Sequence, residues 1–294
     1  MLDFSKKLET IAKNTDSYLK KFFSKQEKNS YLIQPMKYGI FSGGKRFRAT
    51  IIFNTGKIFN INYDILIPVC AAVECIHSYS LIHDDLPSMD NDEFRRGMLS
   101  THKKFGESTA ILAGNSLLTS AYEILSSNTL SLPENIKVEL IHELSRCSGH
   151  SGIAGGQYLD LSFENKKNVK KDIINMQNKK TGKLFGFCCE SVTIINEESE
   201  KTRNLFKSIG QNIGLLFQIT DDLLDVQEDR SVLKNRTKKD IKKNKATLLN
   251  TLGHKQAVNF AKKIKKNLEE KIKKYGTKGY DLLESIEFIL TRKY

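Results

Sequence analysis

The sequence predicts an all-α fold, and three observations lead to that prediction. The 294 residues include only 4 Pro and 18 Gly and no Trp. Apolar residues recur mostly at helical spacing, and strand-like alternation is scarce. Because a helical bundle of this length can bury one large core, we expect residues 1–294 to form a single all-helical domain.

The N-terminal stretch, residues 3–24, is predicted to be an amphipathic helix because its apolar residues share one face. Its mixture of acids and lysines is not typical of a signal or transit peptide. The longest apolar run, residues 65–76, is interrupted by Glu74 and is too short to span a bilayer. We therefore expect a soluble, cytoplasmic protein without stable membrane insertion.

A glycine pair and a group of cations precede the next predicted helix. Gly43 and Gly44 permit a tight backbone conformation, and Lys45, Arg46 and Arg48 follow them. Backbone N–H groups at a helix N-terminus beside three cations form a natural anion site. Because cations at this end oppose the helix dipole, we favour the anion site over a surface basic turn.

The central feature is an apolar helical run that ends in acids. Asp84 and Asp85 are placed at its C-terminal end, and Asp90 follows after the turn forced by Pro87. Carboxylates there oppose the negative end of the helix dipole and repel one another, unless cations are bound. Such a cluster of hard oxygen ligands suits Mg²⁺, which binds one or two carboxylates together with substrate phosphates. The alternative is a solvated acidic loop.

Basic side chains accompany this cluster. His77 lies two helical turns before Asp84 on the same face of the predicted helix. Two interpretations remain open for it, a contact with a diphosphate and a hydrogen-bonded histidine in the core. Arg95 and Arg96 follow the acidic turn directly, and a pair of arginines beside bound magnesium is what a diphosphate requires.

The middle of the chain adds further polar candidates. Gly156 is expected to allow close packing, and Gln157 and Asp160 share a helical face that could line a cavity. Lys179, Lys180 and Thr181 come just ahead of an apolar helix, where a cation and a hydroxyl can face a phosphate or a developing positive charge.

A second acidic cluster repeats the chemistry of the first. Asp221, Asp222 and Asp225 follow an apolar run, and we expect them near the end of its helix. Asp221 and Asp225 share a face at i, i+4, and Gln218 precedes Asp221 by three residues. The two clusters are therefore predicted to face one another across a cavity and hold metal ions between them.

Composition narrows the possible partners. The net charge of +13 allows nucleic acid, an anionic surface or a polyanionic substrate. Much of the excess is lysine scattered over the last third of the chain, and the aromatic interleaving of a single-strand binder is missing. Direct nucleic-acid binding is therefore not expected. The five cysteines form no CxxC pair and are typical of core residues in a reducing compartment.

The motifs GGKRFR, AVECIHSYSLIHDDLPSMDNDEFRRG, HKKFGE, ILAGNSLL, GGQYLDL, KTGKLF and GLLFQITDDLLD occur in this order over nearly the whole chain. Together they resemble those of the short-chain trans-prenyl diphosphate synthases of the bacterial farnesyl diphosphate synthase type. The resemblance implies an all-helical isoprenoid synthase bundle around a deep central cavity, a homodimer, and Mg²⁺ as cofactor, with three ions in the substrate-bound state and Mn²⁺ as a substitute. It also implies the reaction, in which an allylic diphosphate ionises, isopentenyl diphosphate attacks the carbocation and a proton is lost.

The same resemblance assigns roles residue by residue. It implies metal binding by Asp84, Asp90, Asp221 and Asp225, with Asp85 and Asp222 in support. It implies isopentenyl diphosphate contacts by Lys45, Arg48, His77 and Arg96. It implies allylic diphosphate contacts by Arg95, Lys180, Thr181, Gln218 and Lys245. Thr181 and Gln218 offer neutral oxygens that can stabilise a carbocation without attacking it.

The growing chain must fit below the first acidic cluster. The resemblance implies a chain-stopping aromatic at Tyr79, whereas helical geometry alone places Ser80 closer to the Asp84 stripe. A C15 product is expected. The family has a lysine in the loop after the second acidic cluster, and whether Lys234 replaces it stays open. A role for Arg292 and Lys293 at the cavity mouth also stays open.

Three rival interpretations remain. A geranyl or geranylgeranyl diphosphate synthase of the same family would differ only in product length. A terpene cyclase would not need the second diphosphate site that GGKRFR, His77 and Arg96 supply. A non-catalytic regulatory subunit of a prenyl synthase heteromer would be expected to have a decayed acidic cluster, whereas both clusters are intact here.

Overall fold

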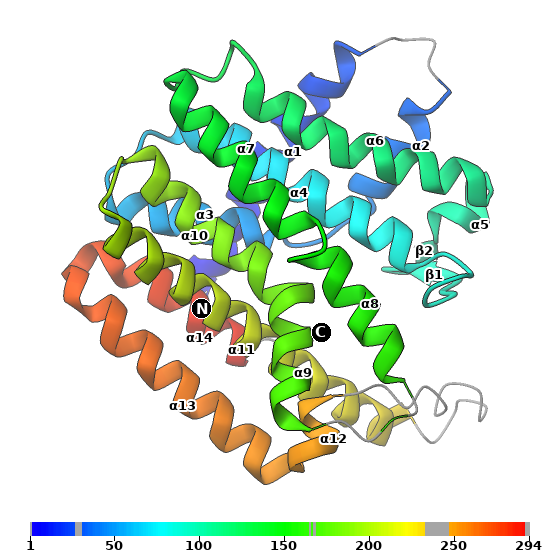
Figure 1. The fold of residues 1–294 in the computed structure, drawn as a ribbon, viewed down its shortest axis with the longest axis vertical. Coiled ribbons are helices and arrows are strands. Elements are labelled where there is room, and N and C mark those ends of the chain that lie inside the picture. Colours follow the sequence, from blue (N-terminus) through cyan, green and yellow to red (C-terminus); the bar gives the residue numbers. More distant parts are fainter. Residues whose placement is uncertain (1, 27–30, 165, 167–168, 233–246, 292–294) are drawn as a thin grey trace. The chain divides into compact units, whose positions relative to one another are not determined.

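A computed structural model describes residues 2–26, 31–164, 166, 169–232 and 247–291 (Figure 1). Helices make up nearly all the regular structure of these residues, so the all-α prediction is confirmed. They form two compact units, one of residues 1–145 with 188–203 and one of residues 146–187 with 204–294. The single domain over 1–294 stays a prediction.

The elements of the first half of the chain follow in order (Figure 1). They are α1 (Leu2–Ser24), α2 (Ile33–Ile40), α3 (Phe47–Ile58), α4 (Tyr63–Asp84), β1 (Phe94–Arg95), β2 (Met98–Leu99), α5 (Thr101–Phe105), α6 (Glu107–Ser126) and α7 (Glu134–Ser148). The two strands pair antiparallel, with Phe94 opposite Leu99.

The described residues of the second half include a π-helical turn and a 3₁₀ segment as well as α-helices. Its elements are α8 (Ile153–Phe163), α9 (Lys170–Gln177), the π-helical turn η1 (Asn178–Gly182), α10 (Lys183–Ile195), α11 (Glu200–Val232), α12 (Leu248–Leu252), α13 (His254–Ile272), the 3₁₀ segment η3 (Lys273–Gly279) and α14 (Tyr280–Thr291).

Helix α4 is the centre of the first unit. Its N-terminus is capped by Asn62, whose side chain accepts a hydrogen bond of 3.0 Å from the backbone N–H of Asp64. It packs most extensively against α6 and also against α3 and α1. Most of its residues are buried, which explains why its sequence is apolar on nearly every side. It ends at Asp84, as the sequence predicts.

Helix α4 is long and apolar enough to cross a membrane by length and composition alone. The sequence interpretation considered only the run of residues 65–76, whereas the apolar segment of the helix is longer. The structure buries 83% of the most apolar window of this helix. A buried core helix passes the same length and composition test, so the apolar surface of α4 is accounted for by packing within its unit.

In the second unit, α8 packs on η1 and α9, and α12 packs on α9 and α13. Helix α11 runs from Glu200 to Val232, so the second acidic cluster lies within the helix and not near its end. The prediction of a helix end is wrong because neither Pro nor Gly occurs between Asp225 and Val232, so the backbone hydrogen bonds of the helix can continue.

Candidate active site

The turn after α4 joins the backbones of the aspartates in the first cluster. The backbone N–H of Asp90 donates to the carbonyl oxygen of Asp84 at 2.8 Å, and the N–H of Asp92 donates to the carbonyl of Asp85 at 3.2 Å. Asp85 and Asp90 are buried, with 2% and 7% of their surface exposed. These bonds fold residues 85–92 back over the end of the helix, so the predicted acidic turn is a defined structure and not a solvated loop.

Asp85 holds Arg95 in place. The Nε of Arg95 lies 3.0 Å from Oδ1 and 3.3 Å from Oδ2 of Asp85, and an Nη atom also donates to Oδ1. Arg95 additionally contacts Asp92 at 3.4 Å. Burial raises the pKa of Asp85, and the Arg95 guanidinium opposes that shift. Asp85 therefore neutralises and orients an arginine that starts from β1 at the edge of the cluster.

The first cluster has the donor atoms for magnesium but not a complete site. Within the described part of the chain, no group of three or more His, Cys, Asp and Glu residues is arranged to hold a metal ion. Asp84 and Asp90 supply hard carboxylate oxygens on adjoining backbone. Since Mg²⁺ uses one or two carboxylates and completes its shell with water and phosphate oxygens, these residues fit the ion together with a phosphate ligand.

A basic group lies in the same unit. Arg96 donates a hydrogen bond to the carbonyl of Gly43 and its guanidinium lies over Gly44, where a Cβ would meet an Nη atom at 2.5 Å. Gly44 also has a φ of +115°, so its backbone conformation favours glycine there. Lys45 is exposed and Arg48 is half-buried at the start of α3.

His77 belongs to this group as a neutral ring. Burial lowers its pKa well below the usual value, and the charges of Arg48 and Arg96 lower it further. The imidazole is therefore uncharged at neutral pH and can donate one hydrogen bond to a diphosphate oxygen without adding a further buried charge.

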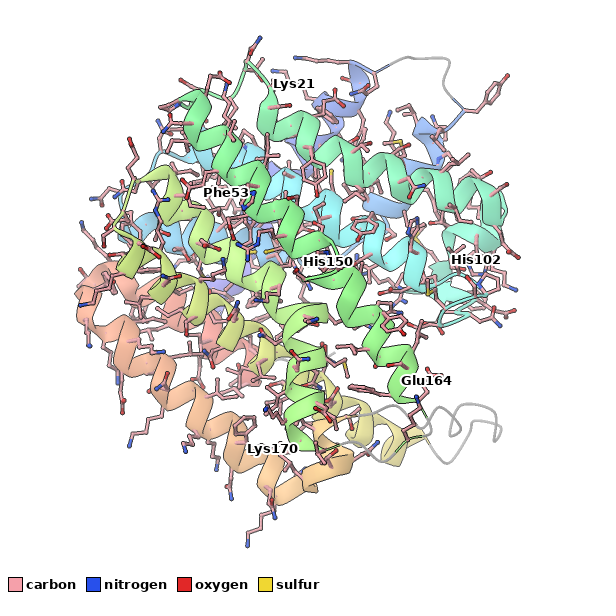
Figure 2. All side chains as sticks on the ribbon, viewed as in Figure 1. Lys21, Phe53, His102, His150, Glu164 and Lys170 are labelled. Carbon is pink, nitrogen blue, oxygen red and sulfur yellow. The ribbon has the colours of Figure 1, made fainter. Side chains whose placement is uncertain are left out.

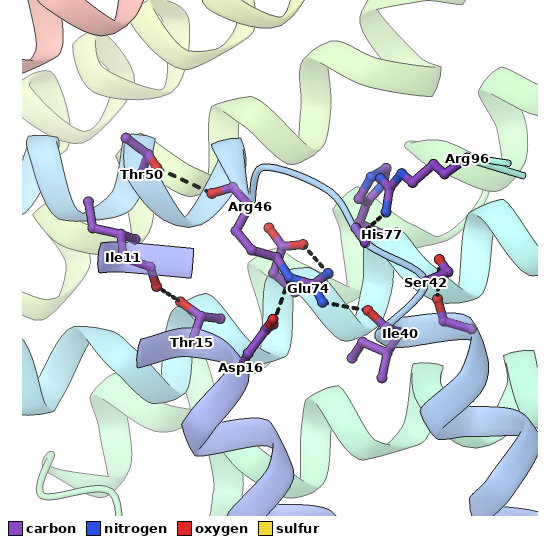
Figure 3. Close-up of polar contacts among 12 residues, drawn as sticks. Ile11, Thr15, Asp16, Ile40, Ser42, Arg46, Thr50, Glu74, His77 and Arg96 are labelled. Atoms are coloured by element: carbon purple, nitrogen blue, oxygen red, sulfur yellow. Dashed lines mark hydrogen bonds and ion pairs between the residues drawn. The ribbon is translucent and has the colours of Figure 1, made fainter. Parts of the chain in front are cut away.

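Arg46 does not join the predicted group of three cations, which is a correction to the sequence interpretation. Its side chain is buried and contacts Asp16 at 2.9 Å and Glu74 at 3.2 Å, and an Nη atom donates to the carbonyl of Ile40 (Figure 3). Burial disfavours its charged form, but Glu74 and Asp16 outweigh that effect and raise its pKa. Its backbone is left-handed, with a φ of 49°, a conformation that costs a non-glycine residue about 1–2 kcal/mol.

In the second cluster, Asp222 is a buried acceptor between two amides. Gln177 donates to its Oδ2 at 3.1 Å and Gln218 donates to its Oδ1 at 3.0 Å. The side chain of Gln218 is therefore oriented by its hydrogen bond to Asp222, four residues later. Sequence spacing had instead paired Gln218 with Asp221 on one helical face. Asp221 is half-buried on the same helix, and the side chain of Asp225 lies outside the described residues.

The π-helical turn η1 presents the cation and hydroxyl of the second unit. The Nζ of Lys180 lies 2.6 Å from Oδ2 of Asp160 on α8, and Thr181 donates to Oε1 of Gln218 at 3.3 Å. Gly156 makes this arrangement possible, because a Cβ there would lie 2.2 Å from the backbone nitrogen of Lys180. The expected close packing at Gly156 is thus confirmed, and Thr181, Gln218 and Asp222 form one hydrogen-bonded chain.

Other predicted candidates lie nearby or outside the described residues. Tyr79 is buried on α4 and makes an edge contact with His83, with ring centroids 5.6 Å apart, and Ser80 donates to the carbonyl of His77 at 2.9 Å. His102, labelled in Figure 2, is buried in α5, where its Nδ1 lies 3.0 Å from the hydroxyl of Ser100. The residues Lys234, Lys245, Arg292 and Lys293 lie outside the described residues.

Comparison with known proteins identifies the family. The sequence profile described as Polyprenyl synthetase matches residues 29–284. The chain belongs to the polyprenyl synthetase family. Farnesyl diphosphate synthase of Escherichia coli (strain K12) is 35% identical over 99% of both chains. Geranylgeranyl diphosphate synthase of Cyanophora paradoxa is 34% identical over 90% of this chain and 88% of its own.

Solved structures agree with the fold of this polyprenyl synthetase. A crystal structure of an FPP/GFPP synthase from Zymomonas mobilis has a TM-score of 0.87 and 32% identity, over 99% of each chain. The isoprenoid synthase fold predicted from the motifs is therefore confirmed.

Sequence reasoning missed three residues of this polyprenyl synthetase. Gln177 holds Asp222, yet it sits in a polar stretch with no spacing signal. Asp16 and Glu74 hold Arg46, and their contact joins positions 16, 46 and 74 of the chain. The one available signal was Glu74 itself, because a lone carboxylate in an apolar helical run is rarely buried without a cation.

Proposed function

We propose that this polyprenyl synthetase condenses isopentenyl diphosphate with dimethylallyl or geranyl diphosphate and releases (2E,6E)-farnesyl diphosphate. The likeness to the E. coli farnesyl diphosphate synthase, which spans 99% of both chains, carries the assignment of the reaction. The presence of separate acidic and basic groups supports it, because the reaction needs one diphosphate to leave and a second one to stay bound.

In the first unit, Asp84 and Asp90 would hold Mg²⁺. The ion would supply charge that stabilises the departing allylic diphosphate. Arg95 contacts the same leaving group, and Asp85 keeps its guanidinium oriented before substrate arrives. Because Arg95 is fixed in advance, little reorganisation is needed when negative charge develops on the leaving group.

Lys45, Arg48, His77 and Arg96 bind isopentenyl diphosphate. The guanidinium of Arg96 already lies over the Gly43–Gly44 backbone, and the neutral His77 adds a donor from α4. Three cations and one neutral donor match a diphosphate that must remain attached throughout the reaction, because its negative charge stays in place while the carbon–carbon bond forms.

In the second unit, Lys180 supplies a cation for the allylic diphosphate, and Asp221 and Asp225 would hold further Mg²⁺. Lys245 is assigned to the same diphosphate. Thr181 and Gln218 present neutral oxygens to the allylic carbocation, and Gln218 is held by Asp222. A neutral oxygen lowers the energy of the cation without capturing it, whereas a free carboxylate at this position would form an ester.

Three further properties belong to the same proposal. The enzyme takes up to three Mg²⁺ ions, with Mn²⁺ as a substitute. It acts as a homodimer. It works in the cytoplasm, which agrees with five buried free thiols.

The deciding experiment is a product assay by chain length. The purified full-length protein is incubated with dimethylallyl and isopentenyl diphosphates, with Mg²⁺ or with excess EDTA. We expect mainly a C15 diphosphate with Mg²⁺ and no condensation with EDTA, with activity restored when Mg²⁺ is added back. A mainly C10 or C20 product would replace the farnesyl assignment by a geranyl or geranylgeranyl one. No product under any metal condition would favour the regulatory subunit.

Replacing Tyr79 by Ala is expected to lengthen the product to C20 or beyond. Tyr79 is buried on α4 about 7.5 Å before Asp84 along the helix axis, so its ring can limit the depth available to the growing chain. The matched control is Tyr63→Ala, which removes an aromatic side chain from the opposite end of the same helix, where it stacks on Phe53. A C15 product from both variants would remove Tyr79 from the chain-length argument.

A further inference from the structure

The buried side chain of Arg46 anchors the loop between α2 and α3. All three nitrogens of the Arg46 guanidinium have acceptors, which come from Asp16 on α1, the carbonyl of Ile40 at the end of α2, and Glu74 on α4 (Figure 3). Arg46 has 4% of its surface exposed and therefore has no part in contacting a ligand directly. Its carbonyl accepts the first hydrogen bond of α3, from the N–H of Thr50 at 3.1 Å.

The same loop carries the proposed isopentenyl diphosphate contacts. Lys45 precedes Arg46 in sequence and Arg48 follows two residues later, so the left-handed backbone at Arg46 fixes the directions in which both side chains leave the chain. Arg96 also donates to the carbonyl of Gly43. Two guanidinium groups, those of Arg46 and Arg96, therefore hold the loop.

Glu74, which accepts a hydrogen bond from Arg46, lies on the same helix as His77. The two residues are three apart on α4 and so lie on neighbouring positions of one helical face. Glu74 has 2% of its surface exposed, and its second carboxylate oxygen has no hydrogen-bond partner in the described part of the chain. A buried pair with an unsatisfied oxygen is a poor way to gain stability, because two apolar side chains of similar volume would do as well or better. The contact is better explained by the geometry that it imposes.

We propose that Arg46 is a positioning residue for isopentenyl diphosphate, and that Glu74 and Asp16 hold it in that role. The proposal rests on the function assigned above to Lys45, Arg48, His77 and Arg96. Arg46 does not contact the substrate. It sets the backbone of the loop so that Lys45, Arg48 and the loop N–H groups converge on one diphosphate, and it places that loop in register with His77.

The test is the steady-state kinetics of Arg46→Met with each substrate varied in turn. We expect KM for isopentenyl diphosphate to rise about ten- to a hundredfold, because small misplacements of a binding group have effects of this size. We expect KM for the allylic diphosphate and kcat at saturation to stay within about threefold. The conservative variant Arg46→Lys keeps the charge but cannot reach three acceptors, so it should recover only part of the affinity.

Two further variants keep the test decisive. Asp16→Asn removes one charge from a partly exposed partner and keeps an acceptor for Nε, so it should fold and show a smaller rise in the same KM. Arg203→Met breaks an ion pair with Glu139 in the same unit and should leave both KM values unchanged. If Arg46→Met does not fold, Asp16→Asn and Arg46→Lys decide the matter.

The outcomes separate this inference from the function on which it rests. A wild-type protein that makes no prenyl diphosphate overturns the proposed function. An active wild-type protein whose Arg46 and Asp16 variants raise both KM values equally, in step with a lower melting temperature, shows a merely structural role. A rise confined to isopentenyl diphosphate supports the positioning role.

Discussion

Replacing Asp84 by Asn is expected to lower kcat about a thousandfold while making the protein slightly more stable. Removing one preorganised group that stabilises transition-state charge typically costs a factor of 10² to 10³, and Asp84 would hold the ion on the leaving diphosphate. Stability should rise by about 0.3–1 kcal/mol, because Asp84 is the last residue of α4, where a negative charge opposes the helix dipole. Single-turnover rates and thermal melting measure the two effects.

The control for Asp84 lies at the other end of the same helix. Asp64 is exposed in the first turn of α4, where a carboxylate is favourable. Asp64→Asn should therefore lose a few tenths of a kcal/mol of stability and keep its full kcat. A gain of stability in Asp84→Asn together with a loss of stability in Asp64→Asn would show that Asp84 serves function at the expense of stability. An Asp84→Asn variant with normal turnover would contradict its role at the metal.

Replacing Lys180 by Met is expected to lower kcat about a hundredfold or more. Lys180 is the lysine of η1 that pairs with Asp160, and its charge would stabilise the departing diphosphate. Its loss also leaves Asp160 without its ion-pair partner, which has a cost in stability of about 1–3 kcal/mol. Kinetics with the allylic diphosphate varied, together with the melting temperature, report on both effects.

Two matched variants separate these effects. Lys179→Met changes the neighbouring lysine of the same turn, which the mechanism does not use, and should leave kcat within about threefold. The double variant Asp160→Asn with Lys180→Met removes the unpaired carboxylate, so stability should recover while kcat stays low. If kcat recovers together with stability, Lys180 acts only by holding α8 against η1, and its role at the diphosphate is wrong.

Much of the fold follows from the sequence because the helices are marked by strong local patterns. The apolar helix α4 and its end at the acidic cluster were predicted, and the motifs identified the family. The fold-back that joins Asp90 to Asp84 was not predictable in detail, because it depends on backbone hydrogen bonds in a short turn. Gln177 was missed for a similar reason, since an isolated amide gives no periodic signal.

Arg46 shows a different limit of sequence reasoning. The three neighbouring cations in KRFR were treated as one anion-binding group. The sequence shows their charges but not the directions in which their side chains point. The left-handed backbone turns the second of them inward toward Glu74, where its charge is used within the protein. Only the dihedral angles distinguish a cation that supports a site from one that faces a ligand.

The π-helical turn at residues 178–182 has a consequence for how this segment can change in length. A π-turn contains one more residue than an α-turn over the same span. Removing one residue here would therefore restore ordinary α-helical winding and leave the side chains after the turn, including the fully packed Leu184 and Phe185, in their present directions. We expect a one-residue deletion in this turn to be tolerated better than one within α10, where it would rotate the following side chains by about 100°.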